Sequence, residues 1–318
     1  MTPVIELRSL TKRYGRRTAL HGIDLTIEPG RVFGLIGPNG AGKTTTMRIL
    51  LDIIRPSGGS ARVLGEDPRL GGPALRRRIG YLPGELALDG RSTAANLLHH
   101  LGELSGGVAP GRIESLAERL GLDLTRPVRS LSKGNKQKVG LVQAFAHSPA
   151  VLVLDEPTSG LDPLVQQEFL AMVREVRDAG STVLLSSHVI SEIEQAADEV
   201  AVLRTGRIVD VSSVERLRAA ARRTVRVTIP LAELADARRA FERVPQLADL
   251  ASLIDADGGT AVLSGTLGDG VAPFIGALHG LSVLDLVMQE PDLEQAVLSF
   301  YGAESRSVTS STPEEVSS

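Results

Sequence analysis

The stretch GPNGAGKTT, residues 37–45, has the residue types and spacing of a loop that binds phosphate. Its glycines let backbone N–H groups turn inward around an anion, Lys43 can reach the terminal phosphates, and the Thr44 hydroxyl can bind Mg²⁺. The apolar run at 31–37 predicts a buried strand and residues 43–54 predict a helix, which is the setting this loop requires. The pattern predicts a nucleotide phosphate site, rather than a glycine-rich turn without a ligand, formed by Gly37, Pro38, Asn39, Gly40, Ala41, Gly42, Lys43, Thr44 and Thr45.

Two acidic residues and a histidine follow apolar runs later in the chain. Asp155 and Glu156 come directly after the aliphatic residues 151–154, and His188 ends the run 181–188. Because ligands collect at the carboxyl ends of parallel strands, we expect these side chains near the phosphate loop. Asp155 would hold Mg²⁺ through water, Glu156 would act as general base or orient the attacking water, and His188 would stabilise charge on the transferred phosphate. Solvated acids and a structural histidine are the alternatives.

A second candidate anion site lies at SKGNKQ, residues 132–137. Ser132, Gly134 and several free backbone N–H groups precede an apolar run with helical spacing, and the N-terminus of a helix attracts negative charge. One chain therefore carries two anion sites that are far apart in sequence. The residues by themselves leave open whether both sites hold the same phosphate.

Alternating strands and helices must position these groups. Residues from about 85 to 145 are expected to be mostly helical. An amphipathic helix is predicted at 168–180, between buried strands at 150–157 and 181–188. Short alternating strands are expected near the N-terminus, for example at 21–30. This order predicts an α/β fold, a mostly parallel sheet with helices on both faces.

The pattern of elements changes near residue 220, after a basic connector. From there the expected order is β-α-β-β-α-β, a small α+β domain of the ferredoxin-like type at 221–303, with its last helix at 291–301. Residues 304–318 are polar and low in complexity, which predicts a disordered tail. The expected domains are thus 1–220 and 221–303.

Composition excludes several kinds of protein. The 318 residues carry a formal net charge of -3, so a polybasic surface for nucleic acid is not expected. There are no cysteines, which excludes disulfides and cysteine-bound metals. No uncharged stretch is long enough to cross a bilayer, because the longest are interrupted by polar residues, proline or glycine. Any role at a membrane is therefore expected to depend on a partner.

Taken together, the phosphate loop, LSKGN, LVLDEP, SGLD and SSH, in that order, resemble the nucleotide-binding subunit of an ATP-binding-cassette (ABC) transporter over residues 4 to about 215. The resemblance implies a P-loop cassette with an antiparallel N-terminal β subdomain and a helical subdomain at about 85–145, binding ATP and Mg²⁺. Lys43, Glu156 and His188 would be its catalytic residues. Tyr14 fits the family's aromatic residue that stacks on adenine, with core packing as the alternative.

The family resemblance also explains the second anion site. In the family, two subunits face each other head to tail, and the signature loop of one closes over the ATP on the phosphate loop of the other. The family's signature LSGGQ reads here as Leu131, Ser132, Lys133, Gly134 and Asn135, with departures at Lys133 and Asn135. The implied partner is a second copy of the chain, or a relative. Asp162, in SGLD, would lie at the seam between the two copies.

One position departs from the family more seriously. Where the family usually has a glutamine that contacts Mg²⁺ and the attacking water, this chain has Gly84, followed by Glu85. Either Glu85 supplies an oxygen to the metal, which we favour, or the loop keeps only a role in coupling to the membrane partner.

The extension that ends in DLEQAVLSFYG narrows the resemblance to the drug-exporter subfamily typified by daunorubicin-resistance ATP-binding proteins. There the membrane-spanning permease is a separate chain, which implies a peripheral subunit on the cytoplasmic face of the membrane. It would drive export of a drug, an antibiotic-like compound or a lipid. The alternatives are an ABC ATPase that does not transport and a regulatory ATPase whose C-terminal module senses a ligand; the presence of both Glu156 and His188 argues against vestigial hydrolysis.

Overall fold

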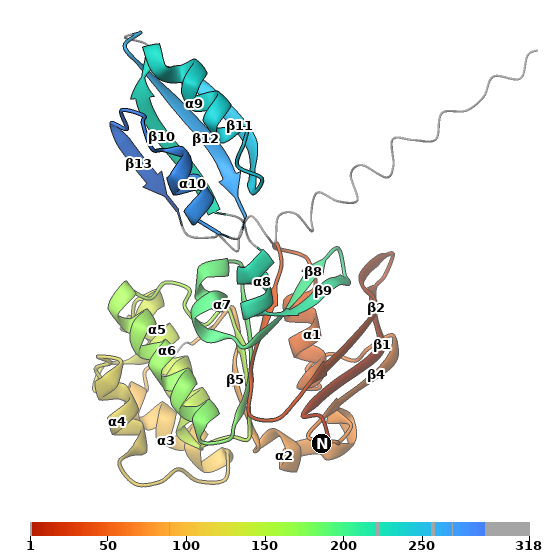
Figure 1. The fold of residues 1–318 in the computed structure, drawn as a ribbon. Coiled ribbons are helices and arrows are strands. Elements are labelled where there is room, and N and C mark those ends of the chain that lie inside the picture. The colour runs from red at the N-terminus through yellow and green to blue at the C-terminus, as the bar shows by residue number, and fades with distance from the viewer. Residues whose placement is uncertain (1, 89, 221–222, 256–257, 269, 290–318) are drawn as a thin grey trace, which may run out of the picture. The chain divides into compact units, whose positions relative to one another are not determined.

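The computed structural model describes residues 2–88, 90–220, 223–255, 258–268 and 270–289. Contacts divide the chain into two compact units, one ending at Val214 and the other beginning at Glu215 (Figure 1). Each unit is described by itself.

A six-stranded sheet forms the centre of the first unit, in the order β5-β6-β7-β3-β8-β9. All neighbouring strands are parallel except β8 and β9, which are antiparallel. Every residue of β3, β6 and β7 is buried, as expected for parallel strands covered on both faces. The strands are β3 (Val32–Ile36), β5 (Ile79–Leu82), β6 (Val151–Asp155), β7 (Thr182–Ser187), β8 (Glu199–Arg204) and β9 (Arg207–Ser213).

Helices cover both faces of this sheet. On one face, α1 (Lys43–Leu50) lies between β6 and a second, antiparallel sheet with the order β2-β1-β4 (Figure 1). Phe33 and Leu35 of β3 share one hydrophobic core with α1 and that second sheet. On the other face, α7 (Ile190–Ala196) packs so closely that a Cβ at Gly34 would meet Ile193. The second sheet contains β1 (Ile5–Tyr14), β2 (Arg17–Ile27) and β4 (Gly58–Val63), and α2 (Pro68–Arg76) follows it.

The region expected to be mostly helical consists of short helices. It contains α3 (Ala94–Leu104), α4 (Arg112–Arg119), the single 3₁₀ turn η1 (Val128–Ser130) and the longer α5 (Lys133–Ala146). α5 packs on β5, and α6 (Pro163–Asp178) packs on β7, so both helices reach the central sheet. The predicted α/β cassette with a mostly parallel sheet, an antiparallel N-terminal sheet and a helical region is confirmed.

Two helix boundaries differ from the expectation, each for a local reason. The helix expected at 43–54 ends at Leu50, because Asp52 has a positive φ of 54° and cannot continue a right-handed helix. The helix expected at 168–180 begins at Pro163, one turn earlier. Asp162 caps it, with its carboxylate accepting a hydrogen bond from the Val165 N–H, and proline is well tolerated at the first helical position.

The second unit has a four-stranded antiparallel sheet in the order β11-β12-β10-β13. With helices after its first and third strands, this is the ferredoxin-like arrangement that the sequence predicted. Its own hydrophobic core includes Phe241 and Phe274. The expected helix at 291–301 and the expected disordered tail at 304–318 lie outside the described residues. The elements are α8 (Val214–Ala220), β10 (Arg223–Pro230), η2 (Leu231–Glu233), α9 (Leu234–Phe241), β11 (Leu247–Ile254), β12 (Thr260–Leu267), α10 (Ala272–Ala277) and β13 (Asp285–Met288).

Candidate nucleotide-binding site

The phosphate loop joins the end of β3 to the start of α1. Gly40 and Gly42 have positive φ values of 82° and 115°, which glycine adopts at no steric cost, and these angles turn the loop back on itself. Gly37 has no room for a side chain, because a Cβ there would collide with the backbone carbonyl of Leu203. The local sequence therefore dictates a tight loop at the N-terminus of a helix, where an anion is stabilised.

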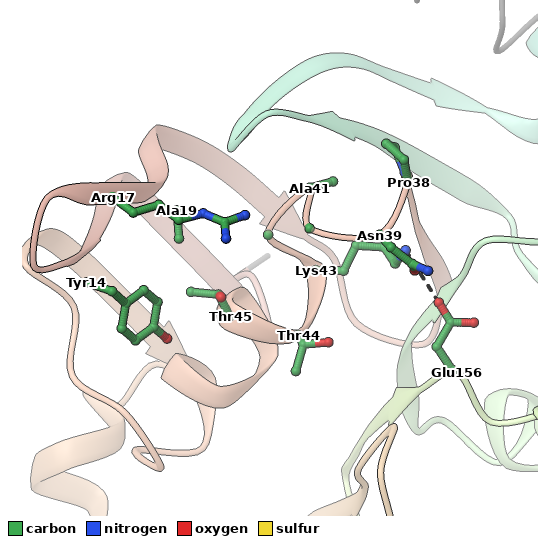
Figure 2. Close-up of a pocket in the computed structure, with 12 residues that line it drawn as sticks. Tyr14, Arg17, Ala19, Pro38, Asn39, Ala41, Lys43, Thr44, Thr45 and Glu156 are labelled. Atoms are coloured by element: carbon green, nitrogen blue, oxygen red, sulfur yellow. Dashed lines mark ion pairs between the residues drawn. The ribbon is translucent and has the colours of Figure 1, made fainter.

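A pocket of about 390 Å³ opens above this loop. In Figure 2, Tyr14 and Arg17 lie on one side of the loop and Glu156 lies on the other. The Tyr14 side chain is 46% exposed, so it is not a core residue. Eight of the nine loop residues predicted from the sequence line the pocket, and Gly37 is the exception. The full lining is Tyr14, Arg17, Ala19, Pro38, Asn39, Gly40, Ala41, Gly42, Lys43, Thr44, Thr45 and Glu156.

Lys43 crosses the loop beneath the pocket. It is 5% exposed, and its Nζ donates a hydrogen bond to the Gly37 carbonyl. The same Nζ lies 3.4 Å from Oε1 of Glu156 (Figure 2). A buried ammonium group held between a carbonyl and a carboxylate is positioned to bind the terminal phosphates of a nucleotide.

Asp155 is a buried carboxylate with one oxygen unused. Its side chain is 1% exposed, and Oδ1 accepts a hydrogen bond of 2.6 Å from the Ser186 hydroxyl. Oδ2 has no hydrogen-bond partner among the residues that the structure describes. Burial, and then the negative charge of Asp155, raise the pKa of the nearby Tyr81. A buried anionic oxygen without a partner is costly unless a cation binds to it, so the site fits a metal ion.

Glu156 stands between a lysine and a histidine. Its Oε2 lies 2.6 Å from Nδ1 of His188, while Oε1 faces Lys43. The Glu156 side chain is 20% exposed and His188 is 58% exposed, so the pair lies at the rim of the pocket. Glu156 has a positive φ of 49°, which is strained for a residue with a side chain. Its N–H donates to the Ser186 hydroxyl at 3.1 Å, which helps to hold this conformation.

The signature residues lie elsewhere in the unit. Ser132 caps α5, with its hydroxyl accepting from the Asn135 N–H at 3.3 Å, and Lys133 begins the helix. Leu131 and Lys133 line a separate pocket of about 410 Å³, together with Lys136 and Gln137. Among the described residues, none lines both this pocket and the pocket over the phosphate loop.

The structure also locates Gly84 and Glu85, where the chain departs from the family pattern. Glu85 is exposed and lines the pocket next to the signature residues, not the one at the phosphate loop. Gly84 lies beside Asp155, since a Cβ there would be 3.2 Å from Oδ2. The structure thus brings Lys43, Glu156 and His188 together and places Glu85 in the other pocket.

Four described residues at or near the site were not predicted from the sequence. Arg17 and Ala19 line the pocket, Ser186 binds both Asp155 and Glu156, and the Gln137 amide donates to backbone carbonyls at the end of β6. A signal existed only for Ser186, which is a polar residue inside an otherwise apolar strand pattern.

Comparisons with known proteins agree with this geometry. The family model described as "ABC transporter" matches residues 20–159. The daunorubicin resistance ATP-binding protein DrrA3 of Streptomyces coeruleorubidus is 33% identical over 308 residues, covering 93% of this chain and 95% of that protein. The chain belongs to the family of ABC transporter ATP-binding subunits.

Other members of the family extend the comparison. The bacitracin transport ATP-binding protein BcrA of Enterococcus faecalis is 35% identical over 220 residues, which cover 68% of this subunit and 71% of BcrA. A solved "ATP binding subunit of ABC transporter" is 28% identical with a TM-score of 0.64, covering 68% of this chain and 92% of that one. This ATP-binding subunit is therefore an ATPase. In the part of the chain that is described, no helix combines the length and the apolar character needed to cross a membrane.

Proposed function

We propose that this subunit binds and hydrolyses MgATP at the interface of a head-to-tail dimer, and that hydrolysis drives export through a separate membrane permease. The observation that supports the chemistry best is the position of Glu156, held between Lys43 and His188 at the rim of the phosphate pocket. A carboxylate in that place can accept a proton from an attacking water. Lys43 would bind the terminal phosphates, and His188 would stabilise the charge that develops on the transferred group.

The groups proposed to hold the metal are the Thr44 hydroxyl and, through water, Oδ2 of Asp155, which has no hydrogen-bond partner among the described residues. A bound Mg²⁺ would neutralise negative charge on the phosphates. The Ser186 hydroxyl keeps Asp155 in place by donating to its other oxygen. Tyr14 is proposed as the adenine platform, because its half-exposed ring lines the same pocket.

Glu85 is the metal ligand with the least support, because it lines the other pocket. Glu85→Ala is expected to raise the Mg²⁺ concentration needed for half-maximal hydrolysis if Glu85 reaches the metal in the closed dimer. Normal hydrolysis with an unchanged Mg²⁺ dependence would leave the loop with its coupling role only.

The dimer is proposed because the two anion sites of one chain lie in different pockets. Ser132 and Gly134, at the N-terminus of the fourteen-residue α5, would donate to the γ-phosphate held by the other copy. Asp162 would lie at the seam, where it caps α6. ATP would then link the copies, and hydrolysis would remove the charge that holds them together.

Analytical ultracentrifugation of Glu156→Gln tests this dimer. With saturating MgATP we expect a stable dimer, because nucleotide stays intact when the general base is lost and hydrolysis falls by about 10²- to 10⁴-fold. Lys43→Ala in the same buffer is the control and is expected to stay monomeric. A Glu156→Gln protein that binds ATP and remains a monomer would contradict the proposal.

The proposed substrate is supported by the names of relatives rather than by the site, and the proposed location by the family resemblance. Relatives named for daunorubicin resistance and bacitracin transport support a drug or antibiotic-like compound, with a lipid as the alternative. The subunit would act on the cytoplasmic face of the membrane, held there by the permease. Reconstitution with the separate membrane permease that the proposal requires, followed by a screen for compounds that stimulate ATP hydrolysis, tests both points. If no tested compound stimulated ATP hydrolysis, the result would favour an ABC ATPase that does not transport.

A further inference from the structure

Gln137 is a buried amide that binds the backbone beside the catalytic carboxylate. It lies one turn into α5, and its side chain is 4% exposed. Its Nε2 donates to the carbonyl of Glu156 at 3.2 Å and to the carbonyl of Pro157 at 3.0 Å. Both protons of the amide are thus used on the turn that carries Glu156, and Gln137 also lines the pocket beside the signature residues, together with Lys133 and Lys136.

The turn needs such support because it is strained. Glu156 has a φ of 49°, a conformation that is strained for a residue with a side chain and persists only where surrounding contacts hold it. On one side the Ser186 hydroxyl accepts the Glu156 N–H. On the other side Gln137 holds the Glu156 carbonyl. The two contacts fix both peptide groups of Glu156, and so the direction of its side chain.

A second contact ties the same helix to the same turn. A Cβ at Gly134 would lie only 2.6 Å from the carbonyl oxygen of Gly160, so the first turn of α5 approaches this loop as closely as backbone allows. The loop begins at Glu156 and ends at Asp162, the cap of α6. The helix that starts with the signature residues therefore meets this loop of its own chain at Glu156, Pro157 and Gly160.

We propose that Gln137 is a positioning residue for hydrolysis: it joins the signature helix to the Glu156 turn and so sets where the Glu156 carboxylate points. This inference rests on the proposed role of Glu156 as general base. It gives α5 two tasks, since its N-terminus would meet the partner's nucleotide while its first full turn holds the base of its own site.

Gln137→Met tests the proposal, because methionine keeps the length of the side chain and removes both donors. We expect kcat to fall by about 10- to 100-fold, the size of effect that a small misplacement of a catalytic group produces. KM for ATP should change less than about threefold, since the phosphate loop is untouched and loss of a transition-state interaction lowers kcat and kcat/KM together. Gln143→Met is the matched control, the same change on the same helix at a half-buried position, and it should keep wild-type kcat.

A double-mutant cycle separates positioning from stability. Single-turnover hydrolysis is compared for Glu156→Gln and for the same protein with Gln137→Met added. If Gln137 acts through the Glu156 carboxylate, the second change has little further effect. If Gln137→Met lowers the rate by the same factor in both backgrounds, its role is structural and the proposal is wrong. Equal rates for Gln137→Met and Gln143→Met would also overturn it.

Binding of a fluorescent ADP and thermal unfolding are measured for each variant to show that it is folded. If Gln137→Met does not fold, Gln137→Asn, which keeps the amide on a shorter stem, takes its place with the same expected outcomes. If the Glu156→Gln protein hydrolysed ATP at the wild-type rate, the proposed role of Glu156 as general base would be refuted. Failure of the proposed function and failure of this inference therefore give different results.

Discussion

At the scale of single residues, Ser186 connects the two acidic groups of the site. Its hydroxyl donates to Oδ1 of Asp155 at 2.6 Å and accepts from the N–H of Glu156 at 3.1 Å. The side chain is fully buried, so water cannot replace either bond at low cost. One hydroxyl thus fixes the Asp155 carboxylate, proposed to bind the metal, together with the backbone of Glu156, the proposed general base.

Removing that hydroxyl should damage both stability and activity. In Ser186→Ala, Asp155 loses a donor and the Glu156 N–H loses its acceptor, which should cost about 1–3 kcal/mol of unfolding free energy for each buried group left unpaired. Urea unfolding measures this, and kcat with varied Mg²⁺ measures the effect on the site. Ser60→Ala, an exposed serine on β4, is the control. A Ser186→Ala protein with wild-type stability and wild-type kcat would contradict this view.

The sequence predicted residues of the candidate site where neighbours in the chain indicate the chemistry, and Tyr14 through the family resemblance. Gly37 to Thr45 form one contiguous loop, and Asp155, Glu156 and His188 end apolar strands, so their types and positions were enough. Arg17 and Gln137 have no such context. Arg17 matters because the β1–β2 turn lies over the phosphate loop, and Gln137 because α5 packs beside the end of β6. Contacts between segments distant in sequence carry no local signal.

At the scale of elements, an arginine joins the helical region to the helix behind the catalytic loop. Arg119 ends α4 and binds two carboxylates of α6, Glu168 at 2.6 Å through Nε and Glu175 at 2.7 Å through both terminal nitrogens. The hydrogen bonds from Arg119 are the main cause that lowers the pKa of Glu175. α6 begins at the Asp162 cap, so this link helps to set the position of the loop that carries Glu156.

Arg119→Met should lower stability by about 1 kcal/mol or less, because the carboxylates are partly exposed and surface ion pairs contribute little. The pH dependence of this stability difference follows from the lowered pKa of Glu175. The stabilising contribution of the Arg119–Glu175 pair is complete above the ordinary carboxyl pKa and is lost as pH falls through the lowered folded-state pKa of Glu175. The stability difference between wild type and Arg119→Met should therefore shrink from neutral to acid pH in urea unfolding. Arg129→Met, an exposed arginine in η1, should show no such trend.

Element types were largely predictable, whereas the order of the strands within the central six-stranded sheet was not. Aliphatic runs such as 151–154 predicted buried strands because both faces of a parallel strand need apolar residues. No local sequence pattern indicates that β3 lies between β7 and β8, because that order depends on which helices cover which face of the sheet. The early start of α6 could have been predicted, because Asp162-Pro163 is a helix-start signal.

At the scale of the whole molecule, the two units have separate hydrophobic cores. The core of the second unit is built on Phe241 and Phe274, whose ring centroids are 5.4 Å apart, with β-branched residues of β10 around them. None of its described residues belongs to the core that holds α1. The nucleotide pocket likewise draws all its lining from the first unit.

In Phe274→Ala the second unit should therefore unfold more easily, while nucleotide binding by the first unit stays intact. Truncating a fully buried phenylalanine costs about 3–5 kcal/mol. We expect limited proteolysis to cleave the second unit at lower temperature, while affinity for a fluorescent ADP is unchanged. Ile275→Ala, at the adjacent exposed position, is the control. A loss of nucleotide affinity in Phe274→Ala would mean that the units depend on each other in a way their cores do not indicate.

The left-handed backbone at Glu156 has a consequence for anyone who redesigns this protein. Asparagine and glycine occupy that region of φ with less strain than glutamate does. A consensus or stability-guided design would therefore favour replacing the side chain proposed as the general base, and we expect the resulting protein to be more stable and to hydrolyse ATP poorly. Selection for heat resistance alone would therefore favour variants of this ATPase that bind nucleotide but no longer hydrolyse it.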